Sequence, residues 1–166
     1  MIIGARTALA ALLTLAPIAM AQAGGDTTTS GLPVPRFVSV KADRVNVRGG
    51  PDKDHDVAWV YTRAGWPVEI VAEFENYRKI RDWQGASGWV YQGMLTGKRS
   101  FIVPAKAASL HRTPARTAEV VATLQPEVTG MIESCSGDWC RVKVSGISGW
   151  LERTDVWGVY KSEPIN

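Results

Sequence analysis

The sequence predicts an all-β protein in which two small barrels follow one another. Its apolar runs are short and alternate with polar residues, as in Val45-Asn46-Val47-Arg48, which is typical of strands with one buried face. Glycine and proline, 16 and 9 of the 166 residues, separate these runs. The second half of the chain repeats the pattern of the first, so each half is expected to have a core of its own.

Residues 1–23 have the features of an export signal. Arg6 is their only charged side chain, residues 9–20 are mostly apolar, and Ala21-Gln22-Ala23 fits the small-x-small cleavage pattern. Cleavage is expected after Ala23, with cleavage two residues earlier as the alternative. An uncleaved anchor is disfavoured, because the run is shorter than the ~20 residues that span a bilayer and contains Pro17. The mature chain is therefore expected in the periplasm or outside the cell, without a transmembrane segment.

Residues 24–35 are rich in glycine, threonine, serine and proline, so a flexible linker is expected there. The first barrel is predicted over residues 36–98. Its strands are expected at 37–41, 44–48, 57–61, 67–74, 77–82 and 87–91. A polar loop separates the second of these strands from the third, and Glu75-Asn76 is a candidate tight turn.

The second barrel is predicted over residues 99–161 as a divergent copy of the first. Corresponding residues of the two copies are Phe37 and Phe101, Pro51 and Pro114, Val57 and Val120, Tyr77 and Trp139, and Trp89 and Trp150. Because no long linker separates the copies, the two barrels are expected to pack close together. Trp157-Gly158-Val159-Tyr160 is expected to form a last strand, and residues 162–166 a polar tail.

Four segments in a fixed order, VNVRGGP, PVEIV, YRKIR and GWVY, resemble the pattern of the bacterial SH3-like domain family. The resemblance covers residues 37–98 and, more loosely, 100–161. The second copy departs from it, since His111-Arg112-Thr113 stands where the first copy has Val47-Arg48-Gly49-Gly50. The resemblance implies two small SH3-like barrels and, for most members of the family, a non-catalytic binding role at the cell envelope.

The two cysteines, Cys135 and Cys140, are separated by four residues, which suits a hairpin loop that places them opposite each other. An exported chain with an even number of cysteines usually pairs them, so a structural disulfide is predicted. Free thiols or a metal site are the alternatives. Zinc would need further ligands, and the sequence offers only the distant His55 and His111. No metal and no other cofactor is therefore expected.

Composition and candidate nucleophiles argue against a nucleic-acid partner and against an enzyme. Without Arg6 of the export signal, 18 Lys and Arg residues face 16 Asp and Glu, a net charge of +2 without a basic block. A Cys–His hydrolase needs a free cysteine, and both cysteines are assigned to one hairpin. The acidic loop at Asp52, Asp54 and Asp56 lacks the glycine and glutamate of a calcium-binding loop.

The aromatic residues divide into candidates for the core and candidates for a ligand site. Positions that are aromatic in both copies, the pairs Tyr77/Trp139 and Trp89/Trp150, are expected to fill the cores. Trp59, Trp66 and Trp83 have no aromatic counterpart in the second copy, and a core that holds an indole seldom accepts a small residue at the same place. These three tryptophans are predicted to be exposed and to bind the ligand, or to cover the seam between the barrels.

Arg48 and Tyr61 are secondary ligand candidates. Arg48 stands beside a turn, where it could bind a carboxylate or a phosphate. Alternatively, its guanidinium braces the long loop by donating hydrogen bonds to backbone carbonyls, which we favour.

The function expected from these features is that of an exported, non-enzymatic binding module. Its expected partner is cell-wall peptidoglycan, through the glycan or the stem peptide. The alternative is a periplasmic protein–protein adaptor that binds an extended segment of another envelope protein in an aromatic groove.

Overall fold

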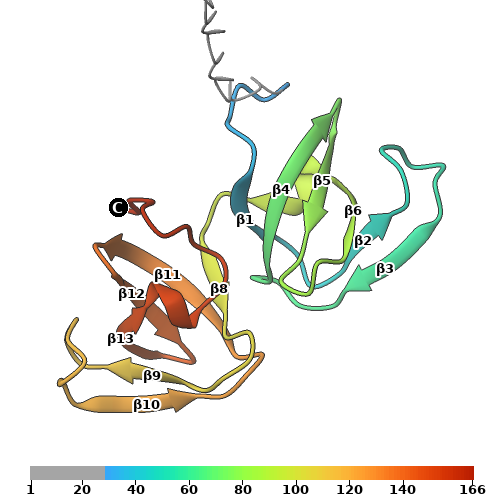
Figure 1. Ribbon diagram of the computed structural model, residues 1–166. Coiled ribbons are helices and arrows are strands. Elements are labelled where there is room, and N and C mark those ends of the chain that lie inside the picture. Colours follow the sequence, from blue (N-terminus) through green and yellow to red (C-terminus); the bar gives the residue numbers. More distant parts are fainter. Residues whose placement is uncertain (1–28) are drawn as a thin grey trace, which may run out of the picture.

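Two β-sheets, each curled around its own hydrophobic core, make up residues 29–166, which are the residues described by the computed structural model (Figure 1). The predicted all-β fold class is confirmed. The predicted export signal and the first part of the predicted linker lie outside the described residues. Among residues 29–166, no helix is long and apolar enough to cross a membrane.

The first sheet has the strand order β3-β2-β6-β5-β4-β1-β7. Its elements are β1 (Arg36–Val40), β2 (Val45–Arg48), β3 (Val57–Tyr61), β4 (Pro67–Phe74), β5 (Tyr77–Arg81), β6 (Ser87–Tyr91), the 3-10 helix η1 (Gln92–Met94) and β7 (Leu95–Thr96). The six strands expected in this half are confirmed to within one residue at each end. Glu75 and Asn76 form the tight turn between β4 and β5, with Glu75 at φ 46°.

The second sheet has the order β10-β9-β13-β12-β11-β8. Its elements are β8 (Ser100–Ile102), β9 (Ala108–His111), β10 (Val120–Leu124), β11 (Thr129–Ser136), β12 (Trp139–Val144), β13 (Ile147–Glu152) and the 3-10 helix η2 (Arg153–Asp155). The strand expected over residues 157–160 is wrong. Only Trp157 pairs, in an isolated bridge to Ile102, and the chain then turns toward the first barrel.

The two cores use different side chains at equivalent positions. In the first barrel Val38 lies opposite Val68, whereas in the second Phe101 lies opposite Gly130. A Cβ atom on Gly130 would lie 2.7 Å from the Phe101 ring, so the glycine makes room for the larger side chain. Phe101 therefore corresponds to Val38 and not, as predicted, to Phe37. A shift of one residue along a strand moves a side chain to the opposite face.

The predicted disulfide between Cys135 and Cys140 is confirmed. Its hairpin is tighter than expected, because β11 and β12 continue through the pair Ser136 and Trp139 and leave only residues 137–138 in the turn. In the first barrel the equivalent cross-strand pair is Glu73 and Arg78, which form a buried ion pair. A covalent bond in one copy thus replaces an ion pair in the other.

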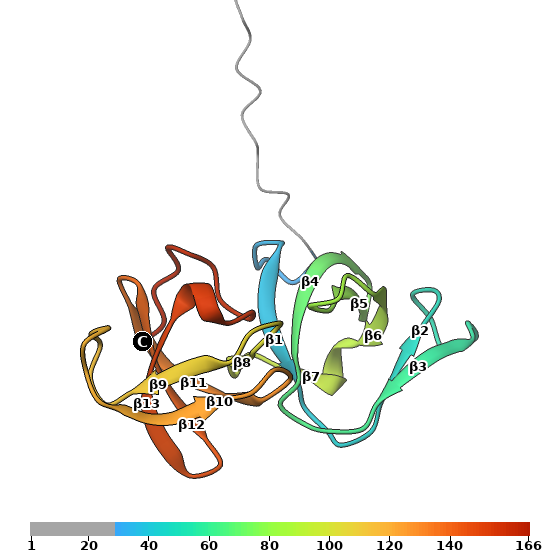
Figure 2. The ribbon, with the colours of Figure 1, turned by 60° about the horizontal axis from the view of Figure 1, so that its bottom comes forward.

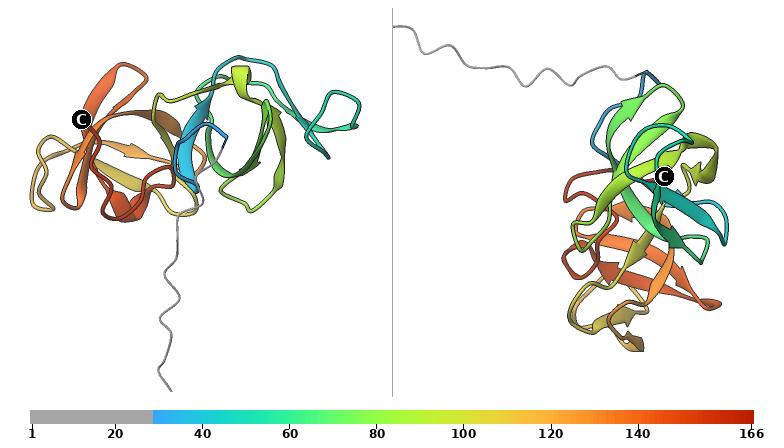
Figure 3. Two further views of the ribbon diagram at one scale, coloured as in Figure 1. Left: turned by 90° about the horizontal axis from the view of Figure 1, so that it is seen from above. Right: turned by 90° about the vertical axis from the view of Figure 1, so that its right-hand side faces the viewer.

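The seam between the barrels is built by aromatic residues of β1 and of the segment after η2. Phe37 contacts the rings of Trp157 and Tyr160, with centroids 4.8 and 4.6 Å away. The Tyr160 hydroxyl donates a hydrogen bond of 2.7 Å to Oε1 of Glu69, a buried residue of β4. Figures 2 and 3 show this C-terminal segment alongside β1. The barrels therefore pack close together, as expected from the missing linker.

The end of the predicted linker is tied to the first barrel. The backbone N–H and the hydroxyl of Ser30 each donate a hydrogen bond of 2.8 Å to the Glu73 carboxylate. Arg36 and Arg78 also form ion pairs with this carboxylate. Residues 30–35 are therefore not the free tether that their composition suggested.

Candidate functional site

Trp89 and Trp150 lie on the outer faces of their sheets, so their predicted place in the cores is wrong. On β6 the residues that point inward are Gly88 and Val90, both buried, and alternation along the strand turns Trp89 outward. Trp150 is half-buried between the inward-facing Gly149 and Leu151 in the same way. Tyr77 and Trp139 are also half-buried and lie outside the two cores.

Trp59 and Trp66 pack against the first core, contrary to the predicted exposure. With Tyr61 they form a row whose neighbouring ring centroids are 6.4 and 6.3 Å apart. Trp59 shares the inward face of the hairpin with its partner Val47, and its indole lies 3.1 Å from the place of a Cβ atom on Gly88. Their ligand-binding role stays a prediction, but part of each side chain is committed to packing.

The second barrel shows why its copy of Trp59 can be small. Ala122 lies opposite Leu110 there, as Trp59 lies opposite Val47 in the first barrel. A Cβ atom on Gly149 would lie 2.6 and 2.9 Å from two carbons of Leu110, whereas on the equivalent Gly88 it would meet both Val47 and the Trp59 indole, so the leucine covers the glycine alone. The premise that an indole and an alanine cannot share a core position was therefore wrong, because the neighbouring side chain compensates.

A shallow hollow lies beside the aromatic row. We call it the Trp66 hollow, and it is lined by Val60, Tyr61, Thr62, Arg63 and Trp66. The Arg63 guanidinium lies 5.3 Å from the centroid of the Trp66 ring. The Tyr61 hydroxyl is buried, and no group of residues 29–166 meets it in hydrogen-bond geometry. Burial, with a contribution from the Asp82 charge, raises the pKa of Tyr61 to about 12, although the nearby Trp59 indole opposes this shift.

The third predicted ligand tryptophan, Trp83, lies in the turn after β5 and is half-buried.

Arg48 braces the loop over residues 49–56, as favoured from the sequence. Its Nη1 donates a hydrogen bond of 2.7 Å to the carbonyl oxygen of His55. His111 has the same place in the second barrel, where its Nδ1 lies 3.1 Å from the carbonyl oxygen of Ala118. The pairing confirms this equivalence, since Arg48 lies opposite Trp89 and His111 opposite Trp150. The alignment of His111 with Val47 was wrong by one residue.

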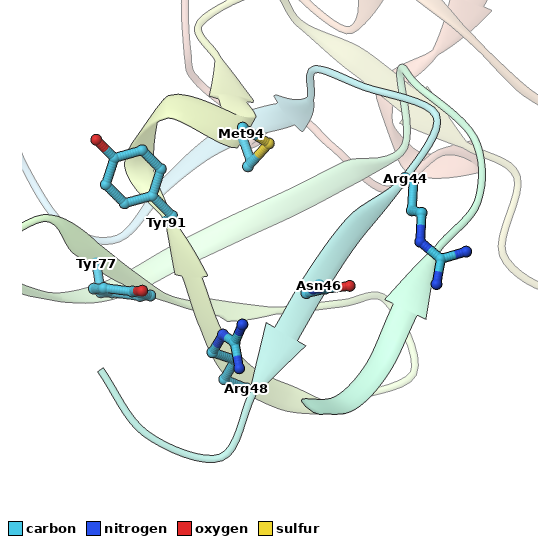
Figure 4. Close-up of a pocket in the computed structure, with 6 residues that line it drawn as sticks. All are labelled: Arg44, Asn46, Arg48, Tyr77, Tyr91 and Met94. Atoms are coloured by element: carbon cyan, nitrogen blue, oxygen red, sulfur yellow. The ribbon is translucent and has the colours of Figure 1, made fainter. Parts of the chain in front are cut away.

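A groove of about 260 Å³ opens on the outer face of the first sheet (Figure 4). We call it the barrel-1 groove, and its lining residues are Arg44, Asn46, Arg48, Tyr77, Tyr91 and Met94. Val45 and Val47 are buried, so the alternation of β2 presents its arginine and asparagine side chains outward. Figure 4 shows the two tyrosines at one end of the groove and Arg44 at the other.

The aromatic end of the groove is held by strand pairing. Tyr77 and Tyr91 lie opposite each other on β5 and β6, with ring centroids 5.8 Å apart and edge to face. Tyr91 is 46% exposed. Its ring covers Gly93, where a Cβ atom would lie 2.8 Å away. A flat and accessible ring on a rigid sheet is suited to stacking on a sugar or on an extended peptide.

The polar end of the groove is cationic. Arg44 is exposed and forms no ion pair with any residue between 29 and 166, and the lining contains no acid. Guanidinium groups match carboxylates in a two-point geometry. The groove can therefore bind a ligand that combines flat rings or peptide planes with negative charge. Within residues 29–166, no group of three or more His, Cys, Asp or Glu residues could hold a metal ion.

The bacterial SH3 domain family matches this sequence twice, at residues 41–97 and 105–158. The chain belongs to the bacterial SH3 domain family. Each match covers all strands of one sheet except its first, β1 or β8, so the protein is a tandem pair of bacterial SH3 domains. No curated protein matches the chain.

Some solved structures are similar to this pair of bacterial SH3 domains. NlpC2 from Trichomonas vaginalis is 12% identical over 75% of this chain and 48% of its own, with a TM-score of 0.35. NlpC1 from the same organism is 13% identical over 74% of this chain and 45% of its own, with a TM-score of 0.35. An NlpC/P60 family protein from Bacillus cereus is 13% identical over 76% of this chain and 57% of its own, with a TM-score of 0.34. The chain spans about half the length of these proteins.

Of the ligand residues predicted from sequence, only Arg48 lines the barrel-1 groove. Tyr61 and Trp66 line the other hollow. Tyr77 and Tyr91 were missed because aromatic residues were assigned by comparing the two copies. The alternation within GWVY contained the missing signal, since a buried Val90 places its neighbour Tyr91 on the outer face of the sheet.

Proposed function

We propose that this protein is an exported, non-enzymatic binding module that binds cell-wall peptidoglycan in the barrel-1 groove. Membership of the bacterial SH3 domain family supports the cell wall as the partner, because such domains often bind cell-wall material. The sequence of residues 1–23 supports export. The non-enzymatic role rests on the pairing of both cysteines in a disulfide, which leaves no thiol nucleophile.

The observation that carries the proposal is the pairing of two tyrosine rings with two arginines in one groove. Peptidoglycan combines sugar rings with short peptides that bear carboxylates. The rings of Tyr77 and Tyr91 offer stacking surfaces, and Arg44 offers charge-assisted hydrogen bonds. Because β2, β5 and β6 hold these groups, little conformational entropy is lost when a ligand binds.

Binding to purified, protein-free sacculi tests this proposal. Tyr91→Ala should weaken binding by roughly 30-fold, because truncating an aromatic residue that a ligand stacks on costs about 2 kcal/mol. Arg44→Ala should weaken binding by about tenfold. Both residues are exposed, so the variants should fold like the parent.

Two matched variants serve as controls in the same sedimentation assay. Arg63→Ala removes an exposed arginine from the other hollow, and Ile147→Ala removes an exposed apolar side chain from the second barrel. Both should bind sacculi like the parent. Equal binding by Tyr91→Ala and the parent would place the site elsewhere, and a loss confined to Arg63→Ala would move it to the Trp66 hollow.

An adaptor for an extended peptide is the second candidate function. Among residues 29–166, β3 pairs only with β2, so the other edge of this strand has backbone groups without a strand partner there, beside the Trp66 hollow. Under this alternative, the parent protein would not sediment with sacculi and would instead retain an envelope protein. Loss of that retention in Arg63→Ala would then support the adaptor.

A further inference from the structure

The face that forms the barrel-1 groove has an equivalent on the second barrel, with different chemistry. Strand pairing aligns the two faces, since Tyr77 lies opposite Tyr91 and Trp139 lies opposite Glu152. Glu152 thus takes the place of Tyr91. Asp155 likewise takes the place of Met94, because each is the last residue of the 3-10 helix that follows, η2 or η1. The aromatic and apolar end of the groove in the first barrel is therefore acidic in the second.

The acid of the second barrel is already bound by its own chain. Arg116, from the loop over residues 112–119, donates two hydrogen bonds of 2.7 Å to the two carboxylate oxygens of Glu152. This contact holds the pKa of Glu152 below its ordinary value. The loop of the second barrel therefore reaches across this face and closes on a carboxylate.

The equivalent loop of the first barrel is anchored in the same way. Residues 49–56 and 112–119 are equal in length and join equivalent strands. Gly49 donates its N–H to the Asp56 carbonyl over 3.1 Å, and Arg112 donates to the Glu119 carbonyl over 2.9 Å. The braces from Arg48 and His111, described above, complete the match. Counting along the two loops places Lys53 at the position of Arg116.

Lys53 has no counterpart of Glu152 to meet, because Tyr91 stands at that position in the first barrel. It is exposed and forms no ion pair within the described part of the chain. Of the two acids that flank it in the loop, Asp54 forms no ion pair with it. Asp52 is engaged, since its Oδ1 accepts hydrogen bonds from the backbone of Asp54 and His55 and lies 2.8 Å from His55 Nδ1. By this equivalence, Lys53 is the unpaired cation of the loop that corresponds to the Arg116 loop, and the groove on the corresponding face already contains two arginines.

We propose that Lys53 is a further ligand-binding residue, which closes on a stem-peptide carboxylate bound in the barrel-1 groove. The inference rests on the proposed function and names the chemical group that the groove recognises. The ligand carboxylate would pair with Lys53 as the Glu152 carboxylate pairs with Arg116 in the second barrel. The Arg116–Glu152 contact occupies the equivalent face of the second barrel, so only the first barrel binds the stem peptide.

The test compares Lys53→Ala with Arg116→Ala, which removes the cation at the matched loop position. Binding of each full-length variant is measured to sacculi whose carboxyl groups are either free or converted to amides. Lys53→Ala should bind untreated sacculi about tenfold more weakly than the parent. Arg116→Ala should bind like the parent. On amidated sacculi, the parent should lose affinity and Lys53→Ala should bind as the parent does.

Each other outcome overturns a defined part of the inference. If Lys53→Ala binds untreated sacculi like the parent, or if amidation changes nothing, the carboxylate role of Lys53 is wrong, while the proposed function stands. If Arg116→Ala is weakened as much as Lys53→Ala, the second barrel also binds and the asymmetry is wrong. If soluble polyphosphate displaces the parent and amidation has no effect, the bound anion is a phosphate. If the parent binds no sacculi, the proposed function fails and the inference with it.

Discussion

Replacing Phe101 with alanine should unfold the second barrel under conditions in which the parent protein is folded. Phe101 is fully buried and is among the largest such side chains of the described residues. Its truncation leaves a cavity beside Gly130, which has no side chain to fill it. Such a change costs about 3–5 kcal/mol, a large part of the ~5–15 kcal/mol that stabilises a typical domain. Denaturant unfolding followed by circular dichroism measures the loss.

Phe74→Ala is the matched control for this substitution. Phe74 is 50% exposed at the end of β4, so its truncation should change the free energy of unfolding by no more than about 0.5 kcal/mol. Equal losses for the two phenylalanine variants would show that Phe101 is not a core residue of the second barrel.

Gly158→Ala should detach the C-terminal segment from the seam. Gly158 has φ 124°, and a Cβ atom there would lie 2.3 Å from the carbonyl oxygen of Ser100, a backbone atom that cannot move freely. The segment that carries Trp157 and Tyr160 would have to move away from Phe37. We expect a loss of at least about 2 kcal/mol and faster proteolysis after residue 156.

Gly137→Ala separates backbone strain from this collision. Gly137 also has a positive φ, 55°, but no atom of the described residues lies within 4 Å of a Cβ atom there. Its replacement should cost only about 1 kcal/mol and should leave proteolysis of the C-terminal segment unchanged. If Gly158→Ala behaves like Gly137→Ala in both measurements, the contact between β8 and this segment does not hold the seam.

The strands were predictable because they follow from local patterns. Alternating apolar residues, together with turns such as Glu75-Asn76, located the six strands of the first barrel to within a residue. The direction in which aromatic side chains point was less predictable. The comparison of the two copies misaligned Phe101 by one residue and wrongly predicted Trp89 to be a core residue. It assumed that equivalent positions of both cores hold similar side chains. Instead, the two barrels distribute side-chain volume differently, so that a larger residue at one core position accompanies a smaller one beside it.

The candidate site was predictable only where it follows from a local pattern in the sequence. The bracing role of Arg48 follows from its place beside a long loop, and the structure confirms it. The barrel-1 groove depends on which strands are neighbours, since β2 and β5 both flank β6 although the chain order is different. Its combination of Arg44 with Tyr91 therefore required the sheet order, which the alternation of residues within single strands does not contain.

Nuclear magnetic resonance can show which residues of the protein contact peptidoglycan, and so whether the barrel-1 groove binds it. Soluble disaccharide–peptide fragments of peptidoglycan would be titrated into the isotopically labelled protein, and the backbone amide and indole N–H signals followed. We expect shifts confined to the barrel-1 groove and the loop that follows β2, from Arg44 to Lys53 and from Tyr77 to Met94 along their outer faces. Shifts concentrated at the Trp66 hollow or on the second barrel, with the signal of Tyr91 unchanged, would contradict it.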